Sequence, residues 1–481
     1  MRSRRGRNLR ESAETAYGTV IPLTSITIGI GIATLGAACV HTIAVDEDGR
    51  VRASAVVPLP PPVRDRPGHS EQDPRLWWPA VERALCQVTA DLPRGEIGAV
   101  AVTATEGTIV PVDRRGLPAG PALLPDDLRG AAFNNRAMEI GGRAEGTPSA
   151  ALGRVAWLAE HAPQARGIRH GPEVIGTQLT GKRVAVDSGH ARGSGYDPRA
   201  DTWASELHKS LGIPSKWLPE VVPPSTVLGT VSRTSAALTG LPKGCPVVAG
   251  MPEDCAAALA AGAVSPGRFA AMLGETYVLK GVSDTPAPDS YRLPGGRWLP
   301  GITSNLGSEA LRDIARLDAA AAARGPADLV LCRKPFDASE TSEFITGEPA
   351  DEVELHRARL ESAAFVERLA LDHLRRLRLV PAEPLLTAGP GTKKSLLWTQ
   401  IRATVSGVRI NVAPHAEPAY GAALLAAAGV WPGGLRDHGG STPVEPVAAE
   451  RDALLASYHR FCGELHQRGW IDDELHAVTT S

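Results

Sequence analysis

The sequence predicts an α/β protein of two domains, and three observations lead to this prediction. The 481 residues are too many for one ordinary hydrophobic core. Short stretches with the pattern of strands are interleaved with longer stretches that have the spacing of helices. A hairpin with a glycine at its tip occurs in each half, as LGAACV at 35–40 and as LGETYV at 273–278, which indicates an internal duplication.

The composition is that of a folded protein, and it argues against nucleic acid and anionic membranes as general partners. Hydrophobic residues make up 43% of the chain, which is enough for a sizeable core. The net charge of -2 gives no reason to expect nucleic acid or an anionic membrane as a partner. The six cysteines form no CxxC pair and have no metal-ligand spacing, so we expect reduced, buried thiols in a cytoplasmic protein.

The first half is predicted to open with a meander of three strands. Isoleucines alternate with threonine and glycine over 26–32, and VHTIAV forms the second strand. Asp48 and Gly49 form a hairpin signal before a third strand at 51–57. Residues 1–24 are expected to be a disordered basic tail. An export signal is the less favoured interpretation of this region, because the apolar run that follows is better explained as a core strand.

A helix and a further strand follow the meander. In HSEQDPRLWWPAVERAL, Asp73 is a suitable N-cap and Pro74 suits the first helical position. IGAVAVTA then has the β-branched and small residues of a buried strand, and 148–161 is predicted to be helical.

The second half is predicted to begin near residue 240 with the strand CPVVAG. The stretch MPEDC follows as a turn with two adjacent carboxylates, and AAALAAGA continues as a helix of small side chains. ARLESAAFVERLALDHLRRL is a long helix with one apolar face. PLLTAGPGTKKSLLWTQI gives a strand, a glycine-rich turn and a helix, and a last helix runs from about Ala448 to Gln467.

Four turns lie at the ends of predicted strands and are candidates for chemistry. They are Gly36–Ala38, Glu253–Asp254, Gly274–Thr276 and Gly389–Thr392. Glycine tips expose backbone N–H groups that can hold phosphate oxygens, and neighbouring carboxylates can bind a metal or accept a proton. Each turn alone is a weak signal, so the functional hypothesis depends on their order.

In that order, the turns and the sequence around them resemble the FGGY carbohydrate kinases, the family of xylulose, ribulose and glycerol kinases. The resemblance runs from about Ile26 to Gln467, and its most specific segments are HSEQDPRLWWPAV, GYDP, LPEVVPPSTVLGTV, GLPKGCPVVAG, DCAAALAAGA, WTQIRATVSG and AEPAYGAALLAAAGVW. VTATEGTIVPVDRRGLPAGPALLPDDLR is most similar to the pentulose-kinase branch.

The resemblance implies two actin-like (ribonuclease H-like) domains with a central cleft. We expect a sugar-side domain over 25–239, an ATP-side domain over 240–468 and a tail over 469–481. The implied ligands are ATP, Mg²⁺ and a small sugar or polyol, and the resemblance is compatible with a homodimer.

The resemblance also assigns the two carboxylates of MPEDC. Glu253 aligns with the general base, where the family has an aspartate followed by glycine. Asp254 could act as the base if the loop shifts by one residue, but we favour it slightly more as the N-cap of a helix that begins at Cys255.

The phosphate and adenosine loops depart from the pattern of the family. Thr34 stands where the family has the aspartate that serves magnesium, although Gly36 is kept. Gly274, Glu275 and Thr276 replace the second phosphate motif, and Glu275 could supply the carboxylate that is missing at Thr34. In the adenosine loop, Gly389, Gly391 and Thr392 are retained around a proline. On the sugar side, the resemblance points to Thr105, Glu106, Asp127 and Arg129.

These departures leave three hypotheses for the function. The first is ATP-dependent phosphorylation of a sugar or polyol hydroxyl, with a pentulose as the acceptor. The second is a pseudokinase that keeps the fold but acts by binding a ligand or a partner, because several altered contacts to phosphate and metal argue against ordinary turnover. The third is an enzyme repurposed for the substrate of a specialised pathway.

Overall fold

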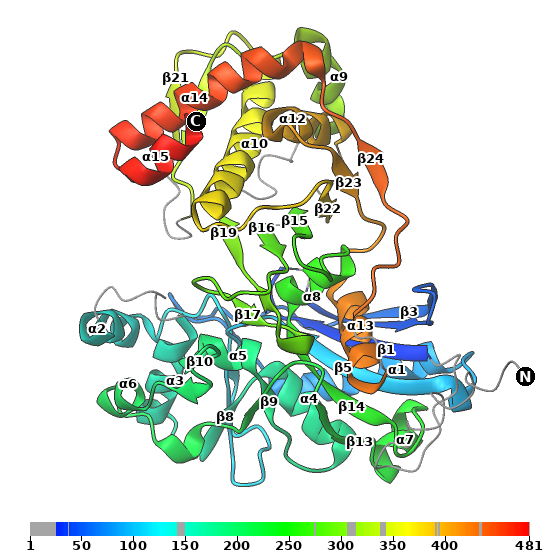
Figure 1. The fold of residues 1–481 in the computed structure, drawn as a ribbon. Coiled ribbons are helices and arrows are strands. Elements are labelled where there is room, and N and C mark those ends of the chain that lie inside the picture. Colours follow the sequence, from blue (N-terminus) through cyan, green and yellow to red (C-terminus); the bar gives the residue numbers. More distant parts are fainter. Residues whose placement is uncertain are drawn as a thin grey trace, which may run out of the picture.

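The computed structural model consists of two lobes, each built on a six-stranded sheet (Figure 1). It describes residues 26–36, 38–141, 150–273, 276–304, 314–336, 343–389, 392, 395–431 and 435–480. The predicted tail at 1–24 lies outside this range. The predicted α/β class and the two domains are confirmed.

The first sheet has the strand order β13-β14-β5-β1-β2-β3. The predicted meander forms its antiparallel edge, with β1–β2 and β2–β3 as neighbours. The central strands β1, β5 and β14 are parallel, and β13 pairs antiparallel with β14. The strands are β1 (Ile26–Ala33), β2 (Cys39–Val45), β3 (Val51–Pro58), β5 (Ile97–Ala104), β13 (Val227–Thr230) and β14 (Pro246–Pro252).

The second sheet repeats this arrangement in the order β19-β16-β15-β22-β23-β24. Its meander β15–β16–β19 is antiparallel, β15, β22 and β23 are parallel, and β24 is antiparallel to β23. The two hairpins with glycine tips therefore occupy equivalent places in the two sheets. The strands are β15 (Phe269–Leu273), β16 (Tyr277–Gly281), β19 (Gly301–Ser304), β22 (Leu385–Ala388), β23 (Ile410–Val412) and β24 (Thr442–Val444).

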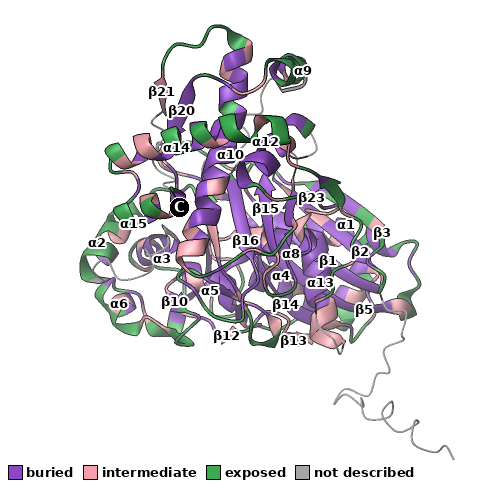
Figure 2. Ribbon diagram, turned by 45° about the horizontal axis from the view of Figure 1, so that its top comes forward, coloured by how far each residue is buried: buried purple, intermediate pink, exposed green. Residues whose placement is uncertain are grey.

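Helices cover both sheets, and their outer faces carry much of the exposed surface (Figure 2). Asp73 caps the turn that leads into α1, and Pro74 occupies its first position, as predicted. The helices are α1 (Trp77–Thr89), α2 (Ala131–Gly141), α3 (Ala150–His161), α4 (Gly171–Thr180), α5 (Ser188–Gly193), α6 (Ser205–Ser210), α7 (Arg233–Thr239), α8 (Glu253–Ala260), α9 (Ile314–Arg324), α10 (Glu352–Arg376), α12 (Leu396–Ser406), α13 (Pro418–Val430), α14 (Arg451–Gln467) and α15 (Asp473–Thr479).

Short two-stranded ribbons complete the lobes. They pair β4 (Glu71–Gln72) with β7 (Ala122–Leu123), β6 (Val110–Val112) with β8 (Gly167–Arg169), β9 (Val186–Asp187) with β12 (Val221–Val222), β10 (Tyr196–Asp197) with β11 (Thr202–Trp203), β17 (Tyr291–Arg292) with β18 (Trp298–Leu299), and β20 (Val330–Arg333) with β21 (Glu343–Thr346).

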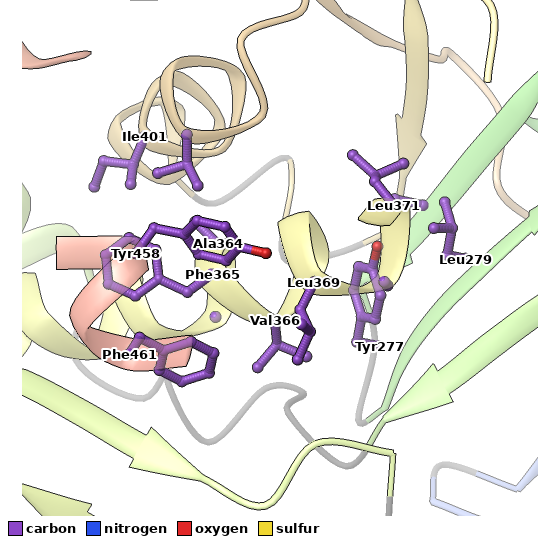
Figure 3. Close-up of a cluster of buried hydrophobic side chains, with 14 of the residues drawn as sticks. Tyr277, Leu279, Ala364, Phe365, Val366, Leu369, Leu371, Ile401, Tyr458 and Phe461 are labelled. Atoms are coloured by element: carbon purple, nitrogen blue, oxygen red, sulfur yellow. The ribbon is translucent and has the colours of Figure 1, made fainter. Parts of the chain in front are cut away.

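The core of the second lobe forms around α10, as its apolar face predicts. Figure 3 shows Phe365, Val366 and Leu369 of α10 among side chains from β16, α12 and α14. These side chains include Tyr277 and Tyr458, which are almost fully buried. Burial of one such large side chain contributes roughly 1.5–3 kcal/mol, so this cluster holds α10 and α14 on the sheet.

Two of the predicted boundaries need correction. β14 begins at Pro246 but belongs to the first sheet, so the sheets divide the chain after Pro252 rather than after residue 239. The predicted tail at 469–481 contains α15, which Asp472 caps and which buries Leu475 against α10 and α14. α15 has only seven residues, which is too short for a clear helical pattern in the sequence.

The cysteines follow the prediction in part. All six are free thiols, and four of them are buried. Cys39 is half-buried and Cys86 is exposed, so burial does not hold for every thiol. No helix in the described part of the chain is both long and apolar enough to span a bilayer.

Helix α13 comes late in the chain but lies in the first lobe, beside β1 and β5 (Figure 1). The close approach is possible because β1 has glycine at position 29. A Cβ atom there would lie 1.8 Å from the carbonyl oxygen of Ala419. This contact ties the two halves of the chain together.

Replacing Gly29 with alanine should therefore lower the free energy of unfolding by about 3 kcal/mol, the upper range for overpacking. Urea denaturation measures this effect. Gly31→Ala is the matched control on the same strand, since the nearest atom to its new Cβ is 3.4 Å away. Equal stability of the two variants would contradict this account of the contact.

Candidate functional site

The candidate site forms where β1, β5 and β14 end side by side. Ile32 of β1 and Pro252 of β14 both pair with Ala104, the last residue of β5. The residues that follow these strands are therefore brought together at one edge of the sheet, which is the usual place for ligands in parallel α/β sheets. This edge carries three predicted residues, Thr34, Thr105 and Glu253.

Glu253 is the first residue of α8 and is half-buried. Its Oε2 accepts a hydrogen bond from the Thr105 hydroxyl at 3.1 Å, and the backbone N–H of Thr34 donates to the same hydroxyl at 3.0 Å. Burial, together with the charge of Asp254, raises the pKa of Glu253 to about 7. A carboxylate with this pKa can accept a proton near neutral pH.

Asp254 is not the N-cap of α8, so the capping role that we favoured for it is wrong. The N-cap of α8 is Pro252, because the helix begins one residue earlier than we expected. Asp254 instead accepts a hydrogen bond from the backbone N–H of Cys255 and forms an ion pair with Lys280, in which Nζ and Oδ2 are 3.1 Å apart. Although burial opposes the charge, Lys280 holds the pKa of Asp254 below its usual value.

Glu106 belongs to a charged cluster that the sequence did not reveal. Its Oε2 accepts a hydrogen bond from the Tyr291 hydroxyl at 2.7 Å, and Arg192 donates to the same hydroxyl at 3.3 Å. The ammonium of Lys280 lies 4.2 Å from the centre of the Tyr291 ring. Burial, and then the charge of Asp254, raises the pKa of Glu106. The only signal for Lys280 was a lysine inside the otherwise apolar strand YVLKG.

His190 of α5 contributes a buried cation next to this site. Its protonated ring donates two hydrogen bonds, from Nδ1 to Asp187 Oδ2 at 2.7 Å and from Nε2 to the carbonyl oxygen of Ala104 at 3.1 Å. Although burial works in the other direction, the charge of Asp187 raises the pKa of His190 to about 9. The imidazolium is thus charged at neutral pH and favours the ionised form of Glu253.

Asp127 and Arg129, the other predicted sugar residues, form an ion pair with each other. Asp127 also accepts a hydrogen bond from the backbone N–H of Ser70, and Arg129 lies over the ring of Trp157. Arg154 links this pair to the loop of Glu106, because it donates to the carbonyl oxygens of residues 127 and 107. No hydrogen bond or ion pair links either side chain to Glu253.

Thr34 is buried, and its hydroxyl lies 3.1 Å from the Thr108 hydroxyl. The first hairpin therefore presents no carboxylate at this position. Gly36, at the tip, has a φ of 61°, which glycine adopts without strain. Within the described residues, no group of three or more His, Cys, Asp or Glu side chains is placed to hold a metal.

The second hairpin and the adenosine loop also lie together. Met272 of β15 pairs with Ala388 of β22, and a Cβ on Gly389 would lie 2.6 Å from the carbonyl oxygen of Leu273. Thr276 is exposed at the start of β16, whereas Thr392 is buried. Gly274, Glu275 and Gly391 lie outside the described residues, so their predicted roles stay predictions.

The buried ion pair of Arg402 and Glu367 is connected to Thr392 through Thr387. The guanidinium of Arg402 donates to Glu367 Oε2 at 2.7 and 2.9 Å and to the Thr387 hydroxyl at 3.0 Å. The hydroxyls of Thr387 and Thr392 are 3.1 Å apart. This chain of contacts joins α10 and α12 to the predicted adenosine loop.

Replacing Arg402 with methionine should lower the free energy of unfolding by about 3–5 kcal/mol, because it leaves the Glu367 carboxylate buried without its partner. Chemical denaturation measures the change. Arg409→Met is a suitable control, since the Arg409–Glu445 pair is more than half exposed and should contribute about 0–1 kcal/mol. Similar losses in both variants would contradict a special role for the buried pair.

Comparisons with known proteins agree with this architecture. The model of the FGGY family of carbohydrate kinases matches with its N-terminal domain at residues 29–260 and with its C-terminal domain at residues 302–430. A xylulose kinase of Streptomyces rubiginosus is 32% identical, and the match covers 74% of this chain and 79% of that protein. An autoinducer-2 kinase of Photorhabdus laumondii is 27% identical over 93% of this chain and 95% of that protein.

Solved structures give the same result for the fold. The xylulose kinase from Rhodospirillum rubrum matches with a TM-score of 0.81 and 25% identity, over 95% of this chain and 100% of that chain. The glycerol kinase of Plasmodium falciparum with ADP has a TM-score of 0.77 at 15% identity, over 93% and 99%, and shows the fold alone. The predicted actin-like fold is thus confirmed, and the chain belongs to the FGGY family of carbohydrate kinases.

Proposed function

We propose that this chain transfers the γ-phosphoryl group of ATP to a hydroxyl of a small sugar or polyol, with a pentulose as the acceptor. Membership of the family supplies the reaction class. The observation that carries the proposal is the Glu253 carboxylate, which is half-buried at the end of the central strands and has a pKa of about 7. We assign it as the general base, with Asp254 as its neighbour in the site.

In this mechanism, Glu253 removes the proton from the acceptor hydroxyl as the oxygen attacks phosphorus. Thr105 holds the carboxylate in place through its hydrogen bond, and the positive charge of His190 limits the rise of its pKa. Most of the rate enhancement in phosphoryl transfer comes from positioning and from neutralising charge. We assign Glu106, which accepts a hydrogen bond from the Tyr291 hydroxyl, as a further contact to the acceptor.

The described residues fit a nucleotide better than they fit a metal. Gly36 and Gly389 have positive φ at turns where a backbone can approach phosphate or adenosine; Thr392 follows Gly389 by three residues, and Thr276 precedes β16 in the second hairpin. Bound Mg-ATP would supply the phosphoryl group and neutralise its charge. Thr34 offers magnesium only a hydroxyl, which already lies close to Thr108, so the proposed ligand with a charge is Glu275.

Release of ADP tests the proposal. The full chain is incubated with Mg-ATP and, in turn, with D-xylulose, D-ribulose, glycerol and xylitol. We expect turnover with at least one pentulose. The absence of ADP release with every acceptor, together with no thermal shift from Mg-ATP, would overturn the proposal.

A second candidate function is ligand binding without turnover. The observation that favours it is Thr34, because the first hairpin presents a buried hydroxyl where the resemblance calls for a carboxylate. A sugar that raises the melting temperature without any release of ADP would support this alternative.

A further inference from the structure

A cavity of about 470 Å³ lies between α5 of the first lobe and the end of α10 in the second lobe. This volume is typical of a site for a small molecule. One wall consists of Arg192, Lys280 and Tyr291, which belong to the cluster around Glu106 and Asp254. This wall of the cavity therefore contacts Glu106 and Asp254, and Asp254 is the neighbour of Glu253 in the sequence.

The charges of the described residues that line this cavity are mostly positive. They include the cations Arg192, Lys280 and Arg376, whereas Asp289 is the one carboxylate among them. Lys280 and Arg376 have their anionic partners, Asp254 and Asp472, outside the lining. The third cation, Arg192, forms an ion pair with Asp289 inside the lining.

Lys280 keeps its charge at neutral pH, and its donors are not exhausted. Although burial opposes it, Asp254 raises the pKa of Lys280 above its usual value. Its ammonium has three donors, and one of them serves Asp254. Burial, and then Arg376, lowers the pKa of His373, so this lining residue is neutral and adds no further charge.

We propose that this cavity binds an anionic end of the acceptor, so that a sugar or polyol that carries a carboxylate or a phosphate binds more tightly than the neutral compound of the same length. The inference rests on the proposed kinase function. Lys280 joins the cavity to Asp254, which is the neighbour of Glu253. In this arrangement the anion contacts the cations of the cavity wall, and a hydroxyl on the side of Asp254 faces Glu253.

Equilibrium binding tests this inference without any need for turnover. Calorimetry compares ribitol, which is neutral, with D-ribonate and ribitol 5-phosphate, which carry a carboxylate or a phosphate on the same carbon chain. We expect at least one of the two anions to bind about tenfold or more tightly than ribitol, the scale of one charge-assisted hydrogen bond. The anion that binds more tightly identifies the charged group of the substrate, and added salt should weaken its binding.

Three variants locate the binding site. Arg376→Gln should weaken binding of the anion about tenfold and leave binding of ribitol unchanged, whereas Lys280→Met and Arg192→Gln, which also touch the cluster around Glu106 and Asp254, should weaken binding of the anion about tenfold more than binding of ribitol. Arg376 is about a quarter exposed, so Arg376→Gln keeps the test valid if the buried Lys280→Met variant does not fold. The control is Arg409→Gln, because Arg409 lies outside the cavity lining and is exposed.

The inference is overturned if neither anion binds more tightly than ribitol, or if tighter binding survives all three substitutions. Release of ADP from neutral pentuloses in that case would leave the kinase function intact. Conversely, tight anion binding that the variants weaken, without release of ADP from any acceptor, would support the anion site and overturn the kinase function.

Discussion

Replacing Glu253 with glutamine should reduce kcat by about 10²–10⁴, the usual contribution of a general base. Glutamine has almost the same shape as glutamate and can still accept the hydrogen bond from Thr105, so the site should keep its geometry. The amide cannot take up the proton of the acceptor hydroxyl. Release of ADP under saturating Mg-ATP and acceptor measures the loss.

The pH dependence of the unmodified enzyme gives an independent check on Glu253. Since burial raises the pKa of this carboxyl to about 7, half of the base is protonated near pH 7. We therefore expect kcat/KM to increase as the pH rises through about 7 and to level off above it. The small residual rate of Glu253→Gln should lack this step. A profile that is already flat between pH 5 and 8 would contradict the assignment.

The stability of Glu253→Gln separates a chemical effect from a folding defect. In the folded protein the carboxyl has a pKa of about 7, above the ordinary value of 4.5, so the folded state binds a proton more tightly than the unfolded state does. Ionisation of Glu253 consequently lowers stability as the pH rises from 4.5 to 7. The glutamine variant escapes this penalty and should melt at a higher temperature than the unmodified protein at pH 8. A lower melting temperature would indicate that Glu253→Gln loses activity because it misfolds.

Most of the fold could be predicted because it depends on local patterns. The alternating isoleucines of β1, the Asp48–Gly49 turn and the Asp73–Pro74 start of the first helix are signals within a few residues. The domain boundary could not be placed in this way. The boundary depends on whether β14 belongs to the first or the second sheet. β14 belongs to the first sheet because it pairs with β5, which is nearly 150 residues earlier in the chain.

In the site, too, the residues that belong to sequence motifs could be predicted, whereas the residues that only tertiary packing brings together could not. The resemblance to the FGGY kinases identified Glu253, Thr105 and Thr34, and the structure places these three side by side. Lys280, Tyr291 and Arg192 were missed, since each comes from a different element and none belongs to a motif. Their positions follow from the packing of β16 against α8 and of β17 against α5. The cap assigned to Asp254 was wrong because the helix starts one residue earlier, which frees its carboxylate to pair with Lys280.

Thr34 and Glu275 are the two positions at which a hairpin could supply a charged ligand to the magnesium ion that accompanies the phosphates. The two hairpins hold equivalent places in their sheets, and the first offers only the hydroxyl of Thr34. If Glu275 supplies the missing carboxylate, replacing it with glutamine should lower kcat by about a hundredfold or more, the scale of losing one group that stabilises transition-state charge. The concentration of Mg²⁺ needed for half-maximal rate should rise as well. Titration with Mg²⁺ at fixed ATP measures both effects.

A second substitution at Thr34 turns this expectation into a test of rescue. Adding Thr34→Asp to the Glu275→Gln variant restores a carboxylate on the first hairpin, where the Thr108 hydroxyl can donate a hydrogen bond to it. We expect this double variant to recover at least about tenfold in kcat, because an ionised ligand again neutralises the metal. Thr34→Asn in the same background has nearly the same shape without the charge and should recover nothing. Because the new carboxylate lies near Thr105, whose hydroxyl binds Glu253, it should also shift the pH profile upward, so the comparison is made at pH 8 and above. If Glu275→Gln keeps full activity, or if Thr34→Asn rescues as well as Thr34→Asp, the missing charge is not supplied by the second hairpin.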